Sequence, residues 1–175
     1  MATLTTISRA ELAHAAEYPL IVVGHQVIGG RANSRDVPDI PALASFLDDV
    51  VGVAGSATAW LELRALGYTP RTSPIELPPA HFQFAVDAAQ HVAAAAVLAV
   101  DRDGVRHQWL SQGTAEHRSP VLVADPWNPA TRFPGESAIA LAELRRAVTE
   151  WAFGDVFPPA AIRWRDASAA EIHWI

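Results

Sequence analysis

Seven histidines are the side chains of this 175-residue sequence that are best suited to acid–base chemistry or metal binding near neutral pH. No two of them have the one-turn helical spacing of a His-x-x-x-His pair, and there is no HExxH motif, so the pattern does not indicate a zinc site. His81, His107 and His117 are the acid–base candidates, and His107 and His117 flank a predicted loop that could bring them together. No metal or other cofactor is expected.

Motifs for nucleophilic, nucleotide-binding or calcium chemistry are weak. The glycines of residues 24–30 lack GxGxxG spacing and a following Lys-Ser/Thr. Ser111, His107 and Asp103 are the right types for a triad, but no GxSxG elbow accompanies them. Asp101 and Asp103 resemble the start of a calcium loop, yet Gly104 follows too early and the later ligands are missing. We therefore expect the two aspartates to be turn residues.

Aromatic and acidic side chains point instead to a binding surface. Trp127, one of six tryptophans, follows Asp125 in a predicted loop, where an exposed aromatic can serve as an anchor. Residues 36–63 contain no basic side chain and five acidic ones, namely Asp36, Asp39, Asp48, Asp49 and Glu62. They form either an ordinary solvated surface with a helix cap or an acidic patch that steers a basic partner.

The overall composition is that of a globular protein, with half the residues hydrophobic and 18% charged. The absence of cysteine excludes disulfides and thiolate metal sites, and the net charge of -6 argues against direct binding of nucleic acid. We see neither a signal peptide nor an apolar run long enough to span a bilayer, so the expected location is the cytoplasm. One domain is expected over residues 1–175, with a proline-rich surface loop at about residues 68–80.

The elements that must position these residues follow from periodicity. Helices are predicted over residues 6–17, 39–52 and 136–154, the second with Asp39 as its N-cap. Strands are predicted over residues 20–23 with 27–28 beyond an interruption at His25, then over 58–63, 81–86, 94–100, 105–110, 121–124 and 160–164. Residues 31–36 are expected to form a loop. The prediction is an α+β domain with a mostly antiparallel sheet and helices packed on one face.

The C-terminal part, about residues 97–164, resembles immunity family one of the bacterial polymorphic-toxin systems. The resemblance is an ordered pattern of a strand, a turn with Asp and Gly, an aromatic strand, a third strand, a helix and a proline before a final tryptophan. The positions that carry it are Val97, Leu98, Ala99, Val100, Asp101, Gly104, Trp109, Val121, Leu122, Val123, Phe133, Pro134, Ile139, Leu141, Ala142, Ala147, Val148, Pro159 and Trp164. The third strand is less rich in tyrosine than the family's, the helix is followed by a different turn, and the proline-rich loop has no counterpart.

This resemblance implies a small cytoplasmic, non-catalytic protein that binds and neutralises a cognate toxin, such as a nuclease or deaminase with a basic substrate cleft. The terminal helix has an apolar stripe for the core, so the partner surface is expected along residues 36–62 or around Asp125 and Trp127. The alternative is a small enzyme or ligand-binding protein of small-molecule biosynthesis with a cleft lined by tryptophan and histidine. Dimerisation through Trp174 and Ile175 is a third possibility.

Overall fold

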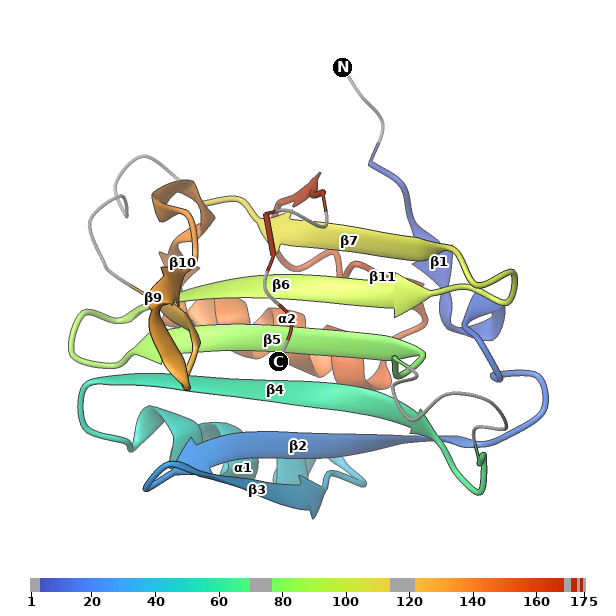
Figure 1. Cartoon of the computed structure of the whole chain (residues 1–175), viewed down its shortest axis with the longest axis horizontal. Coiled ribbons are helices and arrows are strands. Elements are labelled where there is room, and N and C mark those ends of the chain that lie inside the picture. The colour runs from blue at the N-terminus through green and yellow to red at the C-terminus, as the bar shows by residue number, and fades with distance from the viewer. Residues whose placement is uncertain (1–3, 70–76, 114–121, 169–170, 173, 175) are drawn as a thin grey trace.

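A computed structural model describes residues 4–69, 77–113, 122–168, 171, 172 and 174. Its main sheet is antiparallel, with strand order β12–β7–β6–β5–β4–β2–β3 and with β10 beside β6 (Figure 1). These strands are β2 (Leu20–Ile28), β3 (Arg31–Asp36), β4 (Ser56–Ala65), β5 (Ala80–Asp87), β6 (Val92–Val100), β7 (Arg106–Ser111), β10 (Ile139–Ala140) and β12 (Trp164–Asp166).

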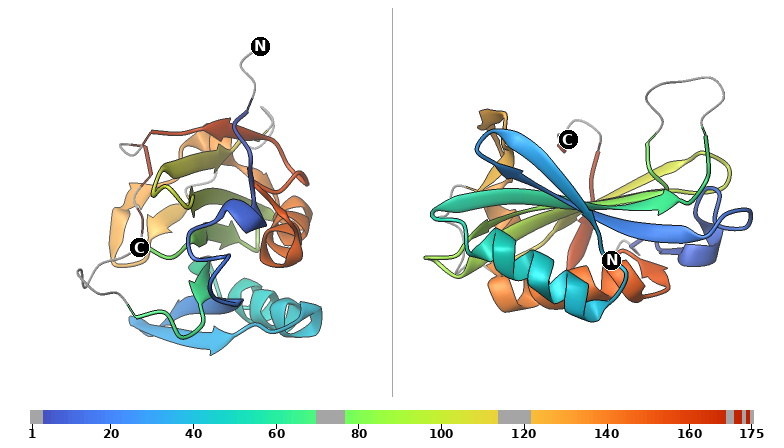
Figure 2. Two further views of the ribbon diagram at one scale, coloured as in Figure 1. Left: turned by 90° about the vertical axis from the view of Figure 1, so that its right-hand side faces the viewer. Right: turned by 90° about the horizontal axis from the view of Figure 1, so that it is seen from below.

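Helices α1 (Ile40–Val51) and α2 (Leu141–Phe153) lie on the same side of this sheet (Figure 2). Two smaller strand pairs complete the architecture, β1 (Ile7–Ser8) with β11 (Val156–Phe157), and β8 (Val123–Asp125) with β9 (Asn128–Arg132). The predicted α+β class, with an antiparallel sheet and helices on one face, is confirmed. Within the described residues, no helix has the length and apolar character needed to cross a membrane.

Alternation along the strands divides the sheet into two faces. In β4, Leu61 and Leu63 are buried in the cluster that lies under the helices, whereas Trp60 and Glu62 point to the opposite face. The cluster under the helices includes Phe46 from α1, together with aromatic residues from other elements: Phe82, Phe84, Trp109, Trp151, Phe157 and Trp164. A smaller cluster on the opposite face lies beneath the β8–β9 hairpin.

Helix α1 follows the sequence prediction closely. The Asp39 side chain accepts a hydrogen bond from the Ala42 N–H at 2.8 Å, and the helix ends at Gly52. Its apolar stripe of Leu43, Phe46, Leu47 and Val50 is buried against the sheet.

Helix α2 begins later than predicted. Residues 135–137 form a 3₁₀ turn, and Ile139 and Ala140 then pair with β6 before the helix starts at Leu141. The Glu143 carboxylate accepts a hydrogen bond from the Ala140 N–H at 2.9 Å, which caps the helix in place of the Ser or Asp that usually does so.

Several other sequence predictions were wrong. The strand expected over residues 160–164 is displaced, since β12 begins only at Trp164. The predicted N-terminal helix contains only a short 3₁₀ turn, Arg9–Glu11, after β1, although Glu11 does accept hydrogen bonds from Ser8 as expected for a capping box. Residues 31–36 are a strand and not a loop, because Gly29 and Gly30 make a two-residue turn with positive φ that pairs β3 with β2. His25 lies inside an uninterrupted β2, and residues 70–76 of the predicted proline-rich loop lie outside the described part of the chain.

Gly24 provides a test of the packing between β2 and α1. A Cβ atom at this position would lie 2.9 Å from Cε2 of Phe46, a buried ring on the helix. We expect Gly24→Ala to lower the free energy of unfolding by about 1–3 kcal/mol through overpacking, as measured by urea denaturation. Phe46→Leu makes room for the added methyl group. The double variant is therefore expected to lose less free energy of unfolding than the two single variants lose together. If the losses of the two single variants simply added up in the double variant, the proposed contact between residue 24 and the Phe46 ring would be contradicted.

Candidate functional site

The face of the sheet that no helix covers, called here the open face, carries an unusual set of side chains at its centre. Cross-strand pairing places His25 opposite Trp60, Trp60 opposite Gln83, and Glu62 opposite His81. These five residues come from β2, β4 and β5, the middle strands of the sheet. We call them the open-face cluster. Such neighbours are close because directly opposed side chains in an antiparallel sheet lie about 4.5–5.5 Å apart at Cβ.

His25 is the most highly connected member of the cluster. Its Nδ1 lies 2.6 Å from Oγ of Ser34 on β3, and its Nε2 lies 3.3 Å from Oε2 of Glu62. The Nε2 atom is not aligned for a directed hydrogen bond, so its contact with Glu62 is mainly electrostatic. The imidazole also stacks on Trp60, with ring centroids 5.0 Å apart and planes within 6°. These contacts hold the buried ring in one orientation.

Glu62 is ionised over the whole neutral range. Burial by itself would raise the pKa of this carboxyl group, but the contact with His25 and its charge, together with Arg64, outweigh burial and lower the pKa to about 2. Arg64 Nε donates to Glu62 Oε2 at 2.7 Å. The carboxylate is therefore a fixed negative charge beneath the open face.

His81 is buried and neutral. Burial lowers its pKa to about 4, with the nearby charge of His25 acting in the same direction and Glu62 and Gln83 opposing it. Its Nε2 has no hydrogen-bond partner among the described residues. The Trp174 ring lies edge-on to His81, with centroids 5.2 Å apart, and its Nε1 donates to Gln108 Oε1 at 2.7 Å. Trp174 of the predicted dimerisation tail thus packs on its own chain, whereas Ile175 lies outside the described residues.

The β8–β9 hairpin brings Trp127 to the edge of the cluster. Thr58 Oγ1 and Gln83 Nε2 each donate to a backbone carbonyl of β8, at 2.8 and 2.7 Å, and so attach the hairpin to the open face. Asp125 accepts the Trp127 N–H at 2.8 Å and shapes the turn. Trp127 is 52% exposed, and its ring meets the buried Trp60 edge-on with centroids 6.0 Å apart. The arrangement presents one tryptophan to solvent with a second supporting it.

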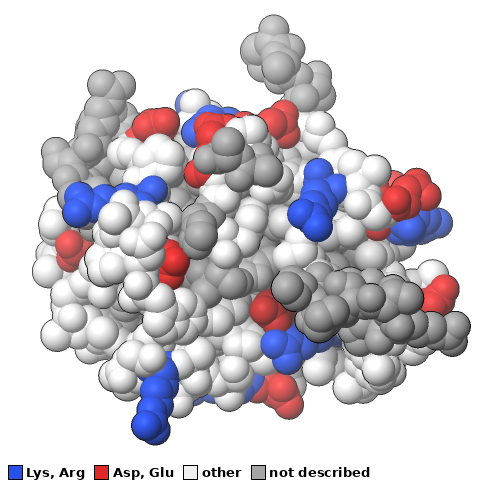
Figure 3. Space-filling model, viewed as in Figure 1, with Lys and Arg blue, Asp and Glu red and all other residues white. Residues whose placement is uncertain are grey.

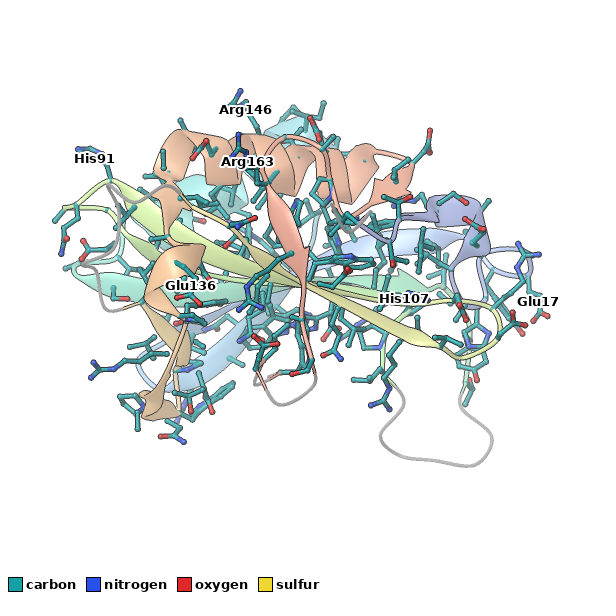
Figure 4. All side chains as sticks on the ribbon, turned by 90° about the horizontal axis from the view of Figure 1, so that it is seen from above. Glu17, His91, His107, Glu136, Arg146 and Arg163 are labelled. Atoms are coloured by element: carbon teal, nitrogen blue, oxygen red, sulfur yellow. The ribbon has the colours of Figure 1, made fainter. Side chains whose placement is uncertain are left out.

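Edge views separate the two sides of the sheet. Figure 4 shows α2, with Arg146 pointing outward, on one side and the β8–β9 hairpin on the other. Figure 3 looks onto the open face, where acidic and basic side chains are interspersed among uncharged ones.

The five acidic residues predicted from residues 36–63 are not gathered in one patch. Asp39 caps α1, Asp48 pairs with Arg145 at 2.7 Å and Asp49 pairs with Arg35 at 2.8 Å. These three lie on the helix side of the sheet, while Glu62 lies on the open face and Asp36 is exposed at the end of β3. Of the predicted partner-binding residues, the structure brings together Asp125 and Trp127, and Glu62 lies on the same face of the sheet, two positions after the Trp60 that Trp127 contacts.

The three acid–base histidines proposed from the sequence do not form one group. His107 pairs with Ala99 and lies on the helix side of the sheet, where its Nε2 is 3.1 Å from Oδ2 of Asp101. His81 pairs with Leu98 on the open face, and His117 lies outside the described residues. The sequence prediction missed His25, although alternation from Ile21 would have placed it on the same side as Val23.

A wide cleft lies away from the open-face cluster. It encloses about 1020 Å³ beside the N-terminal turn and the β6–β7 hairpin, and its lining includes His14, Tyr18, Tyr68 and Asp101. Within the described residues, no group of three or more His, Asp or Glu side chains is placed to hold a metal ion.

Comparison of the chain with protein-family models, with curated proteins and with solved structures gives no match. The resemblance to the immunity family stays a prediction from the sequence pattern.

Proposed function

We propose that this chain is an immunity protein that neutralises a cognate toxin by binding it through the open face, a mode of action that needs no catalysis. The observation that carries this proposal is the exposed Trp127, whose ring packs on Trp60, the residue two positions before the ionised Glu62 on the same face of β4. Tryptophans that are partly exposed and backed by rigid neighbours are typical anchors of protein–protein interfaces. The resemblance over residues 97–164 supplies the kind of partner.

The ionised Glu62 favours a basic partner surface. It lies on β4, one of the middle strands of the main sheet, in a chain whose net charge is -6. Its ion-pair partner Arg64 is half-exposed, so an arginine or lysine of a binding partner can replace or join that contact. Nucleases and deaminases bind nucleic acid through basic clefts, and an inhibitor with a carboxylate among aromatics would compete with the substrate there.

Co-expression tests this function directly. The chain is produced in bacteria together with the product of a polymorphic-toxin gene that neighbours its own gene. We expect growth to be restored and the two proteins to co-purify. Continued toxicity together with the absence of a complex would overturn the proposal.

Trp127→Ala is expected to weaken the toxin complex by about 30-fold or more, since truncation of an anchor costs at least about 2 kcal/mol of binding free energy. Calorimetric titration of the purified proteins measures this change. Val105→Ala is the matched control, because Val105 is 51% exposed but lies on the β6–β7 hairpin away from Trp127. If Trp127→Ala and Val105→Ala bound the toxin with equal affinity, the open face would not be the binding surface.

A further inference from the structure

Three neighbouring strands place a serine, a histidine and a glutamate in a line on the open face. Ser34 Oγ lies 2.6 Å from His25 Nδ1, and His25 Nε2 lies 3.3 Å from Glu62 Oε2. A hydroxyl, an imidazole and a carboxylate in this order are the parts of a serine nucleophile with its base and the group that orients the base. The contacts of the histidine nitrogens are opposite to those of the serine proteases, but either nitrogen can accept the proton.

The position of Ser34 on the ladder explains the short contact with His25. Val37 N–H donates to the Val22 carbonyl at 2.9 Å, so these two residues form a hydrogen-bonded pair between β3 and β2. Since such pairs alternate along an antiparallel ladder, His25 and Ser34, three steps further on, form a non-hydrogen-bonded pair. Side chains approach most closely in such pairs, and the backbone N–H of Ser34 points away from β2.

Charge sets the tautomer of the histidine. The pKa of Glu62 is lowered to about 2, where His25 and Arg64 outweigh the opposing effect of burial, so the carboxylate is negative at neutral pH. A negative oxygen 3.3 Å from Nε2 favours the tautomer with its proton on that nitrogen. In the neutral form of His25, the lone pair of Nδ1 then faces the Ser34 hydroxyl and accepts its proton.

In this group of residues the histidine is held rigidly and the serine is accessible to solvent. His25 is only 5% exposed and is stacked on Trp60, so its ring does not rotate freely away from Ser34. Ser34 itself is exposed, because β3 is the last strand of the sheet. Its N–H at the free edge can donate to an oxygen that becomes negative when the hydroxyl reacts.

We propose that Ser34 is the nucleophile of a Ser34–His25–Glu62 site that accepts acyl groups from small activated esters. Ser34 Oγ attacks the carbonyl carbon of the ester while its proton passes to His25 Nδ1. The bond to the leaving oxygen breaks, this oxygen takes the proton from His25, and the acyl group remains on Ser34. Water then releases the carboxylic acid by the same steps. This activity is separate from toxin binding and does not depend on it.

The test uses the full chain with two reagents: p-nitrophenyl acetate and a fluorophosphonate probe, whose phosphorus bonds to the attacking serine oxygen as fluoride leaves. We expect one adduct, located on Ser34 by peptide mass spectrometry, and a release of p-nitrophenol that disappears in Ser34→Ala. The matched control is Ser56→Ala, because Ser56 is also an exposed serine on a strand of the same sheet and has no histidine opposite it. Ser56→Ala is expected to keep both signals.

Three further variants, at His25 and Glu62, separate activation of Ser34 from simple exposure of its hydroxyl. His25→Gln is expected to lower the labelling rate by about 100-fold, the usual contribution of a general base. Glu62→Asp is expected to keep part of the labelling rate that Glu62→Gln loses, because the carboxylate positions the imidazole. Thermal melting confirms that each variant is folded. Absence of an adduct on Ser34 in the folded wild-type chain, or a labelling rate unchanged in folded His25→Gln, would overturn the proposal.

Discussion

Replacing Trp151 with alanine is expected to lower the free energy of unfolding by about 3–5 kcal/mol, the usual cost of removing a large aromatic side chain from a core. Trp151 is completely buried between α2 and the sheet. Its ring meets Phe82 and Phe157 edge-on, with centroids 5.7 and 6.1 Å away. Since its Nε1 has no hydrogen-bond partner among the described residues, the loss is one of packing. Urea denaturation followed by circular dichroism measures it.

Phe153→Ala is the matched control on the same helix. Phe153 is 38% exposed, so its removal is expected to change the free energy of unfolding by about 0.5 kcal/mol or less. A Trp151 variant as stable as the Phe153 variant would show that α2 does not pack on the sheet through this ring.

Strand alternation was the strongest guide that the sequence offered to the fold. In residues 58–63 it separated Ala59, Leu61 and Leu63 from Trp60 and Glu62, and the structure places these two sets on opposite faces of β4. The α1 stripe and its Asp39 cap were equally legible, because both depend on contacts within a few residues. Local periodicity therefore predicted the elements whose burial is one-sided.

Strand β3, whose conformation depends on pairing outside its own segment, was not predicted. Strand β3 is polar and exposed along most of its length, so nothing in its composition distinguishes it from a loop. Its conformation follows from the Gly29–Gly30 turn and from the backbone hydrogen bonds to β2. The prediction of a loop failed because those partners lie outside the segment.

The site shows the same limit more strongly. Ser34, His25 and Glu62 lie on three strands and meet only because the register of two ladders places Ser34 opposite His25, and Glu62 diagonally across from it. In contrast, the acidic stretch of residues 36–63 had no basic residue of its own, yet Arg35 and Arg145 from outside it neutralise Asp49 and Asp48. The charges of one stretch of sequence therefore do not determine the charge of a surface, because residues from other stretches lie beside them.

Acidification is expected to destabilise the fold through His81. Its pKa is about 4 in the folded chain because burial disfavours the charged imidazole, against 6.5 for an ordinary histidine. Between these two values the unfolded chain binds more protons than the folded one, so the free energy of unfolding falls as the pH falls. The loss amounts to about 3 kcal/mol, and it is absent above pH 6.5. Urea denaturation at several pH values from about 7 to about 4 measures it.

His81→Gln isolates this contribution, since glutamine does not titrate. We expect the free energy of unfolding of this variant to be nearly independent of pH in that window, whereas His91→Gln, which replaces an exposed histidine, is expected to keep the slope of the wild-type chain. Glu62 acts in a lower window: its folded pKa of about 2 lies below the ordinary 4.5, so its stabilisation is complete above pH 4.5 and is lost as the pH falls towards 2. If the free energy of unfolding of His81→Gln still fell with pH as steeply as that of the wild-type chain, His81 would not be the group responsible. This variant no longer has a titrating imidazole next to Trp174.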